Sequence, residues 1–213
     1  MIILGLTGSV GMGKTAAART FRNLLVPVHD ADQTVHDLMA PGGEAFHQVA
    51  EQFGEAIENG RINRKRLGDV VFRDGDRLKQ LESILHPLVG KKKHWFLSVS
   101  ARRQHPLVVL DVPLLFETGG QSRCDGVVTV SAPWFVQSAR VLARPGMTVE
   151  KFAAILAKQL PDEEKRRRSD FVVQTGNGRL ESLRAIRKII NETRTWRGRH
   201  WPPGPLLSGR LGR

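Results

Sequence analysis

Five short apolar runs, each bounded by turn residues, recur along the chain and predict buried strands. They cover residues 2–6, 25–28, 107–110, 127–130 and 171–173. None of them alternates with polar residues, which is typical of strands that are covered on both faces, as in a parallel sheet. The chain therefore starts with a predicted strand and returns to the same kind of strand four times.

Apolar residues three or four positions apart predict helices between these strands. One such set is Ala17, Phe21 and Leu24, a second is Val136, Ala139, Leu142 and Ala143, and a third is Leu180, Leu183, Ile186 and Ile190. An alternation of strands and helices indicates an α/β fold, in which helices flank a parallel sheet.

The long stretch of residues 32–105 interrupts this alternation. It has helical spacing at Phe46, Val49 and Phe53, then at Val70 and Val71, and again at Leu78, Leu81 and Leu85, but no convincing strand. We interpret it as a helical insertion beside the sheet. A second short helical excursion, at about residues 140–168, is crowded with Arg and Lys and suits a lid over a phosphate site.

These patterns predict one folded unit over residues 1–197 with a tail behind it. The core comprises segments 1–31, 106–139 and 169–197, the insertion about 32–105 and the lid about 140–168. Residues 198–213 are rich in Pro, Gly and Arg without periodicity, which is typical of a loosely ordered basic extension.

Composition places the chain among ordinary globular proteins. It has 213 residues, of which 40% are hydrophobic and 25% are charged. No apolar run approaches the roughly 18 residues of a membrane-spanning helix, and the first residues lack the basic region of an export signal. We therefore expect a cytoplasmic protein with no membrane partner. Cys124 stands alone, so no internal disulfide can form, and it is interpreted as a small buried thiol.

The net charge of +12 raises the question of a polyanionic partner. Lys and Arg number 33 against 21 Asp and Glu, and residues 179–213 hold nine basic and two acidic residues, which leaves +5 for residues 1–178. The excess is thus largely a property of the C-terminal part. No helix-turn-helix pattern or zinc-finger spacing accompanies it, so nucleic-acid binding by the basic tail is the weaker alternative, and we expect no nucleic acid as partner.

The strongest local signal is the sequence GSVGMGKT at residues 8–15, which follows a predicted strand and opens a predicted helix. It matches the G-x-x-x-x-G-K-[ST] phosphate loop, whose glycines let backbone N–H groups turn inward toward phosphate oxygens. In such a loop Lys14 reaches the β- and γ-phosphates, and Thr15 offers a hydroxyl to magnesium. We predict a nucleotide site formed by Gly8, Ser9, Val10, Gly11, Met12, Gly13, Lys14, Thr15 and Ala16.

A phosphate loop does not fix the reaction, and the carboxylates near it narrow the choice. Asp30 and Asp32 follow the second predicted strand, and Asp111 ends the third, so all three lie where ligands of open parallel sheets bind. Either of the first two can accept a proton from an attacking hydroxyl, hold magnesium through water, or simply cap a helix. Asp111 suits a water-mediated contact with magnesium. The sequence has no guanine-reading N-K-x-D motif, which disfavours a GTPase.

From residue 1 to about residue 187, the chain resembles the dephospho-CoA kinase family. The resemblance is carried by GLTGSVGMGKT, HDAD, APGG with Phe53 and Gly54, GRINRKRL at 60–67, Val71 and Phe72, LESILHP at 81–87, DVPLLFE at 111–117, Asp125, Gln137, Arg140, Gln159 and SDFVV at 169–173. Two positions, Ser9 and Ala16, depart from the family pattern, and so does the segment Gln174-Thr175-Gly176, which stands where the family has an Asn near the adenine.

The resemblance implies a phosphate-loop kinase fold and transfer of the γ-phosphoryl group of ATP to the ribose 3′-hydroxyl of dephospho-CoA, with Mg²⁺. It places Asp32 at the general base and Arg140 and Arg144 at lid arginines that bind ATP and neutralise charge. The loop motif and the positions of the carboxylates at the strand ends make Thr15, Asp32 and Asp111 the candidate metal-binding residues. The acceptor side would comprise Asp32, Arg64, His86, Pro87, Leu115 and Glu117.

Other interpretations of these residues stay open at this point. His86-Pro87 also suits the start of a helix with Pro at its first position, and Leu114 and Leu115 also suit packing. Another nucleotide or small-molecule kinase is the alternative function, since phosphate-loop folds serve many reactions. We expect a monomer or a weak homo-oligomer.

Overall fold

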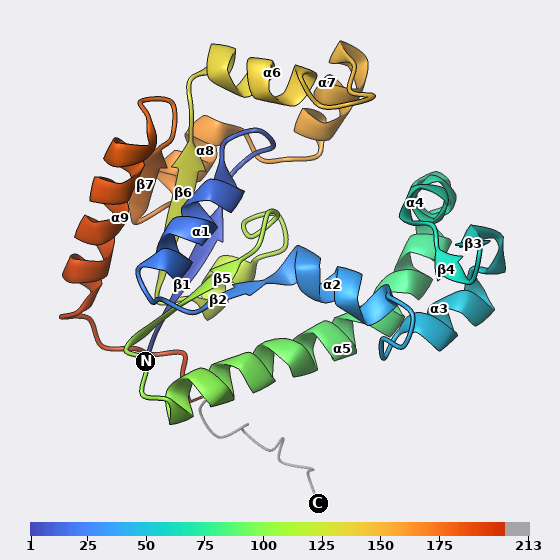
Figure 1. Cartoon of the computed structure of the whole chain (residues 1–213), viewed down its shortest axis with the longest axis horizontal. Coiled ribbons are helices and arrows are strands. Elements are labelled where there is room, and N and C mark those ends of the chain that lie inside the picture. The colour runs from blue at the N-terminus through green and yellow to red at the C-terminus, as the bar shows by residue number, and fades with distance from the viewer. Residues whose placement is uncertain (203–213) are drawn as a thin grey trace, which may run out of the picture. The chain divides into compact units, whose positions relative to one another are not determined.

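The computed structural model describes residues 1–202 (Figure 1). Most of the predicted tail at 198–213 therefore lies outside the described residues. The described chain divides into two compact units, one formed by Met1–His29 together with the chain from Ser100 onward, and the other by Asp30–Val99. Each is described by itself below.

The first unit is built on a five-stranded sheet of parallel strands, which confirms the predicted fold class. The strand order is β2-β5-β1-β6-β7, so the first strand of the chain is the central one. The strands are β1 (Ile2–Thr7), β2 (Val28–Asp30), β5 (Leu107–Asp111), β6 (Gly126–Ser131) and β7 (Phe171–Gln174).

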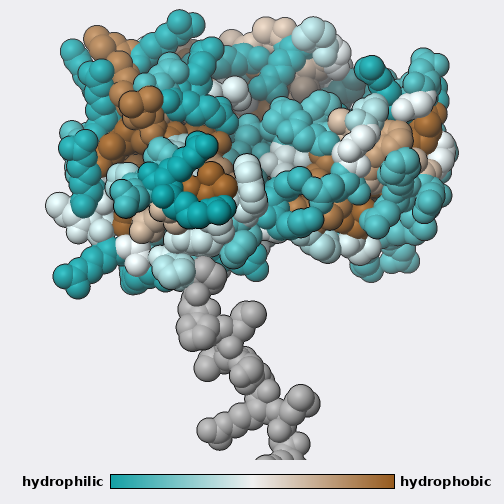
Figure 2. All heavy atoms as spheres, turned by 60° about the horizontal axis from the view of Figure 1, so that its bottom comes forward, coloured by the Kyte–Doolittle hydropathy of each residue, from teal (hydrophilic) through white to brown (hydrophobic). Residues whose placement is uncertain are grey.

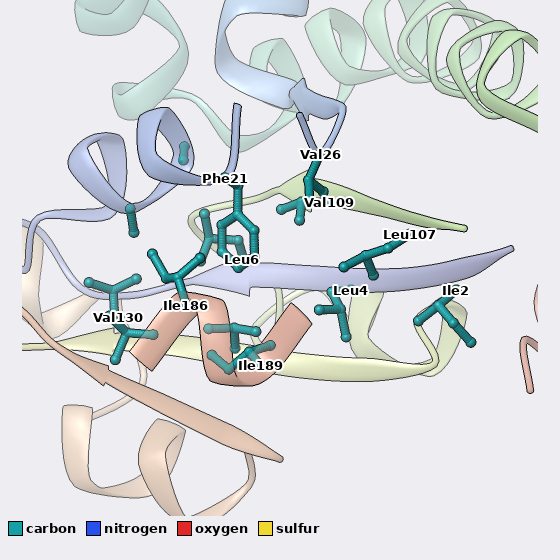
Figure 3. Close-up of a cluster of buried hydrophobic side chains, with 14 residues drawn as sticks. Ile2, Leu4, Leu6, Phe21, Val26, Leu107, Val109, Val130, Ile186 and Ile189 are labelled. Atoms are coloured by element: carbon teal, nitrogen blue, oxygen red, sulfur yellow. The ribbon is translucent and has the colours of Figure 1, made fainter. Parts of the chain in front are cut away.

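Helices of the first unit connect these strands and cover the sheet (Figure 1). They are α1 (Lys14–Asn23), the short η2 (Gly120–Arg123), α6 (Trp134–Leu142), α7 (Val149–Ala157), α8 (Asp162–Arg167) and α9 (Arg179–Thr193). Phe21 of α1 and Ile186 of α9, both fully buried, pack with Leu4 and Leu6 of β1 in the core that Figure 3 shows. Burial of each such side chain stabilises the fold by roughly 1.5–3 kcal/mol.

Gly5 marks a close approach at β1. A Cβ atom at Gly5 would lie 2.5 Å from the Leu115 side chain and 3.1 Å from Cys124 Sγ. Cys124 is buried, as the sequence predicts. The segment that follows β5 thus packs directly on β1, and any larger residue at position 5 would displace it.

The carboxyl ends of the parallel strands meet at one edge of the sheet and determine where ligands can bind. Leu6 of β1 pairs with Asp111 of β5, Thr7 pairs with Thr129 of β6, and Ser131 pairs with Gln174 of β7. The loops that leave these strands therefore gather around the end of β1. Such an edge is where open parallel sheets place their ligands.

The predicted strand at residues 25–28 is wrong in its position, because β2 begins only at Val28. Residues 24–26 instead end helix α1 in a Schellman turn, in which Leu25 N–H donates to Arg22 O and Val26 N–H donates to Phe21 O. Leu25 has a φ of 63° and is 85% exposed. Glycine normally takes this left-handed position and would have indicated the helix end. Because leucine stands there instead, the sequence 25–28 looks like an apolar strand.

The second unit is mainly helical, with its own core around Phe53, Val49, Leu38 and Leu67. Its elements are α2 (Ala31–Met39), α3 (Phe46–Gln52), η1 (Gly54–Ala56), β3 (Ile57–Glu58), β4 (Arg61–Ile62), α4 (Arg64–Arg73) and α5 (Gly75–Arg102), whose last residues belong to the first unit.

The expectation that this stretch contains no strand is wrong, because β3 and β4 form an antiparallel hairpin. Asn59 and Gly60 connect the two strands with φ values of 50° and 70°. An Asn-Gly pair with positive φ at both residues is the preferred two-residue hairpin turn. The signal was therefore present in the sequence, but the flanking strands are only two residues long.

In residues 1–202, no helix combines the length and the apolar character needed to cross a bilayer. On the face drawn in Figure 2, hydrophilic side chains separate the apolar areas from one another.

Candidate functional site

The phosphate loop joins β1, which ends at Thr7, to α1, which begins at Lys14. Two of its glycines have left-handed backbones, with φ of 79° at Gly11 and 91° at Gly13. The loop is also tightly enclosed, since a Cβ atom at Gly11 would lie 2.5 Å from Val141 Cγ2 of α6. Glycine is therefore required at position 11 by both its conformation and its surroundings.

The hydrogen bonds of the loop show which N–H groups can receive a phosphate. The N–H groups of Met12 and Ala16 are engaged within the loop, at Ser9 O and Gly13 O respectively. Val10 N–H donates to Gln159 Oε1 over 3.0 Å. Within residues 1–202, the N–H groups of Gly13, Lys14 and Thr15 have no acceptor. They lie at the start of α1, where the helix dipole also favours an anion.

Lys14 and Asp111 form an ion pair in the first unit, with 2.6 Å between Lys14 Nζ and Asp111 Oδ1. Asp111 is almost completely buried at 2% exposure of its side chain, whereas the Lys14 side chain is 16% exposed. The pairing follows from topology, because Asp111 ends β5 beside the residue that precedes Thr7 on β1. The carboxylate therefore holds the ammonium at the loop while leaving the lysine in reach of a ligand.

A cavity of about 740 Å³ adjoins the loop at Gly13 and Ala16, a size that suits a nucleotide. Three of its lining residues are arginines: Arg19, Arg140 and Arg179.

Arg140 lies in the last turn of α6 on the wall of this cavity. Its Nη1 donates to Thr175 Oγ1 over 2.9 Å, and its Nη2 donates to Thr175 O over 2.8 Å. Thr175 Oγ1 in turn donates to Met12 O of the loop over 2.6 Å. The residue that departs from the family pattern thus links Arg140 to the phosphate loop. Arg144 is exposed and follows α6.

In the second unit, the structure distinguishes the two acidic residues of the HDAD motif. Asp30 is the N-cap of α2, and its Oδ1 accepts a hydrogen bond from Gln33 N over 3.0 Å. Asp32 lies in the first turn of α2 and is exposed. The capping role that the sequence left open for either residue therefore falls to Asp30.

The other predicted acceptor residues of the second unit, Arg64, His86 and Pro87, are all exposed. Arg64 opens α4 directly after its N-cap Asn63. The interpretation of Pro87 as the first residue of a helix is wrong, because Pro87 lies inside α5, which begins at Gly75. The local sequence His86-Pro87 suggested a helix start, whereas the helical spacing at Leu78, Leu81 and Leu85 already belongs to the same helix upstream of the proline.

Glu117 belongs to the first unit, and one of its carboxylate oxygens contacts both a lysine ammonium and a backbone N–H group. Its Oε1 lies 2.9 Å from Lys165 Nζ and accepts Leu160 N–H over 2.7 Å. Burial raises the pKa of the Glu117 carboxyl, but the hydrogen bonds from Lys165 and Leu160 outweigh this effect and hold the pKa below its ordinary value. Both bonds use Oε1, and neither uses Oε2. The predicted contact of Glu117 with an acceptor stays a prediction.

Leu114 and Leu115, which precede Glu117, differ in exposure. Leu115 is 2% exposed and packs against Gly5, whereas Leu114 is 39% exposed. Leu115 therefore takes the packing role that the sequence also offered.

Sequence reasoning missed Lys165, which is fully buried in α8. The residue lies in the charged run EEKRRR, and such a run normally indicates a solvated helix face. Gln137 and Gln159 entered only as part of the family resemblance, and their contacts with Val10 had no signal in the sequence.

The chain is similar to known proteins over most of its length. The family model "Dephospho-CoA kinase" matches residues 2–181. A dephospho-CoA kinase of Mesorhizobium japonicum is 52% identical over 199 residues, which cover 93% of this chain and all of the relative. One of Paramagnetospirillum magneticum is 57% identical over 166 residues, 78% of each chain.

Among solved structures, a protein of Thermus thermophilus is similar, with a TM-score of 0.79 and 36% identity over 90% of this chain and 96% of its own. The dephospho-CoA kinase of Campylobacter jejuni shares the fold, with a TM-score of 0.64 and 23% identity over 89% of this chain and 96% of its own. The model match over most of the chain and the identity to full-length relatives show that this chain belongs to the dephospho-CoA kinase family.

Proposed function

We propose that this chain binds ATP at its phosphate loop and transfers the γ-phosphoryl group to the ribose 3′-hydroxyl of dephospho-CoA, which yields coenzyme A and ADP. Family membership gives the reaction and the phosphoryl donor. The observation that carries the assignment to this site is the loop itself, with three N–H groups that have no acceptor within residues 1–202, Lys14 and an adjoining cavity of about 740 Å³.

The loop and Lys14 hold the triphosphate. Phosphate oxygens accept from the N–H groups of Gly13, Lys14 and Thr15, and the ammonium of Lys14 turns from Asp111 to the β- and γ-phosphates. Preformed donors of this kind stabilise charge that develops on the transferring group without reorganisation during the reaction. Arg140 and Arg144 add positive charge on the side of α6, where a guanidinium can bind two phosphate oxygens at once.

Asp32 is the base that accepts the proton of the acceptor hydroxyl. Three observations support this assignment: Asp32 follows β2 within two residues, its side chain is exposed, and its neighbour Asp30 already caps α2. A carboxylate within hydrogen-bond reach of a hydroxyl orients it in line with the phosphorus and takes its proton.

The oxygen donors near the loop fit Mg²⁺, which prefers hydroxyl and carboxylate oxygens together with phosphates. Thr15 carries an exposed hydroxyl in the first turn of α1, and Asp111 presents a carboxylate at the end of β5. Thr15 and Asp111 would hold the ion, with Asp32 as a further ligand through water. When bound, the ion neutralises negative charge on the phosphate oxygens.

The residues proposed to bind the acceptor are Glu117 in the first unit and Arg64, His86 and Pro87 in the second. Arg64 and His86 offer exposed polar groups of the second unit to a polyanionic acceptor, and Glu117 has Oε2 for a hydroxyl donor. Dephospho-CoA carries phosphates and a long pantetheine arm, and the arm suits the helical second unit.

An acceptor panel tests the proposal. Purified protein with ATP and Mg²⁺ is offered dephospho-CoA, nucleosides and nucleoside monophosphates, and kcat/KM is measured for each. We expect dephospho-CoA to be preferred by at least about 100-fold, because a site that hydrogen-bonds the whole acceptor discriminates strongly against fragments. Equal or faster phosphorylation of a nucleoside monophosphate would refute the proposal and indicate another small-molecule kinase.

Replacing Asp32 tests the base. Asp32→Asn should lower kcat about 100- to 1,000-fold, within the usual range for a general base, while the Kd for ATP changes less than about threefold. Asp37→Asn, further along α2, is the matched control and should keep kcat. A wild-type kcat in Asp32→Asn would show that Asp32 is not the base and that another carboxylate takes this role.

A further inference from the structure

Two glutamines bind the peptide groups of Val10 in the phosphate loop. Gln137 of α6 is 3% exposed, and its Nε2 donates to Val10 O over 2.8 Å. Gln159, which follows α7, accepts Val10 N–H at its Oε1 over 3.0 Å. The Gln137 side chain thus offers an N–H donor to the Val10 carbonyl, and the Gln159 side chain offers an oxygen acceptor to the Val10 N–H.

This arrangement has a consequence for the loop's conformation. Val10 lies between Gly8 and Gly11, and glycines lose more conformational freedom than other residues when they are held in place. A loop with three glycines in six residues is therefore intrinsically flexible. The two glutamines fix its middle, and they direct Val10 N–H away from the phosphate, which leaves the donors at the start of α1 to bind it.

The linker after α7 also reaches a second part of the site. Leu160, the residue next to Gln159, donates its N–H to Glu117 Oε1 over 2.7 Å. Lys165 forms an ion pair with the same carboxylate. Two consecutive residues therefore bind the phosphate loop and the segment after β5. The Glu117–Lys165 pair thereby helps to keep Gln159 at Val10.

We infer that Gln137 and Gln159 are positioning residues for phosphoryl transfer. They touch no reacting atom, and they act by holding the Val10 peptide so that the loop is shaped for the triphosphate before ATP arrives. The inference rests on the proposed binding of ATP at this loop. It predicts that Gln159 is needed as a hydrogen-bond acceptor for Val10 N–H, and that Gln137 is needed as a donor to Val10 O.

Amide hydrogen exchange at Val10, measured by NMR in the nucleotide-free protein, tests this asymmetry. Gln159→Met removes the acceptor and should speed exchange of Val10 N–H about tenfold, the loss of one typical hydrogen bond. Gln159→Glu keeps an acceptor and should stay within about threefold of the wild type. Gln80→Met, which removes an amide–amide bond in the second unit, is the control and should leave Val10 unchanged.

Kinetics provide the second readout. Gln137→Met should raise KM for ATP about tenfold, and Gln137→Glu should raise it further because a carboxylate would face the Val10 carbonyl. KM for dephospho-CoA should change less than about twofold. Circular dichroism and the exchange of α9 amides verify that each variant is folded, and Gln159→Glu supplies a readout even if Gln159→Met is unstable.

Unchanged Val10 exchange in Gln159→Met would overturn the inference, as would equal effects of Met and Glu at position 159. Failure of the proposed function is distinguishable, because it would appear as absent phosphorylation of dephospho-CoA by the wild type while the exchange pattern at Val10 still reports on the glutamines.

Discussion

Two lysine–carboxylate ion pairs of the first unit have similar N–O distances, but the buried partner is the carboxylate in one pair and the lysine in the other. At the phosphate loop, Lys14 Nζ lies 2.6 Å from Asp111, and the buried partner is the carboxylate, with 2% exposure against 16% for the lysine. At α8, Lys165 Nζ lies 2.9 Å from Glu117, and the buried partner is the lysine, with 0% exposure against 17% for the glutamate.

The difference explains why one lysine can serve a ligand and the other cannot. Lys14 has a path to solvent and can exchange its carboxylate for a phosphate. Lys165 is fully buried, so an ammonium that left Glu117 would lose its counter-charge in the protein interior, at a cost of several kcal/mol. We therefore propose different roles for the two lysines, phosphate binding for Lys14 and positioning for Lys165.

The largest expected effect follows from removing the ligand-facing lysine. Lys14→Ala should lower kcat with ATP and dephospho-CoA by at least about 1,000-fold, because the developing charge on the phosphoryl group loses its cation. Lys165→Met should retain much more activity. Comparable losses in the two variants would break the distinction between the pairs.

The next effect concerns stability and compares the two halves of the α8 pair. Glu117→Gln leaves the fully buried Lys165 without its counter-charge and should lower the free energy of unfolding by about 3 kcal/mol in urea titrations. Lys165→Met leaves a glutamate that still reaches water and should cost less. A double variant, Glu117→Met with Lys165→Met, should recover part of the loss, since no charge is left unpaired.

At the phosphate loop, the order should be reversed. Lys14→Ala removes the ammonium that faces the buried Asp111 carboxylate, and it should lower the free energy of unfolding by about 2 kcal/mol more than Asp111→Asn does. Adding Asp111→Asn to Lys14→Ala should restore stability and leave turnover low. This double variant therefore separates the catalytic loss from the loss of stability.

The smallest effect is a dependence on pH. The pKa of Glu117 lies below its ordinary value of 4.5, so the unfolded chain binds more protons than the folded one in the range between the two values. Stability from Glu117 is complete above pH 4.5 and is lost as the pH falls through the lowered pKa. The difference in unfolding free energy between wild type and Glu117→Gln should accordingly narrow from pH 6 toward pH 3.

Glu192→Gln is the control for this titration, since Glu192 pairs with Lys188 on the surface of α9, where the two side chains are 46% and 77% exposed. Exposed pairs of this kind contribute about 0–1 kcal/mol, so its difference from wild type should stay small throughout. A Glu117 difference that does not change with pH would contradict the lowered pKa.

Much of the fold was predictable because most strands of the first unit are continuous apolar runs, and its helices have apolar residues three or four positions apart. The errors occurred where a local signal was unusual or short. Leu25 occupies a left-handed helix end that glycine normally takes, and the Asn59-Gly60 turn joins strands of two residues each. Neither feature produces a periodic pattern long enough to identify.

The site was predictable to the extent that it is local. The phosphate loop follows from eight consecutive residues, and Asp111 from its place at the end of a predicted strand. Contacts across the chain had no such signal: Lys165 is buried only because α8 packs on β6, and Gln159 meets Val10 across 149 positions of sequence. Their roles required the tertiary structure.

The central claim is that Lys14 leaves Asp111 for the triphosphate, whereas Lys165 stays on Glu117. A crystal structure with a non-hydrolysable ATP analogue and Mg²⁺ tests it most directly. We predict phosphate oxygens on the N–H groups of Gly13 and Thr15, Lys14 Nζ within hydrogen-bond distance of the β- or γ-phosphate, and Lys165 still bonded to Glu117. A triphosphate bound away from the loop, with Lys14 still on Asp111, would contradict the account.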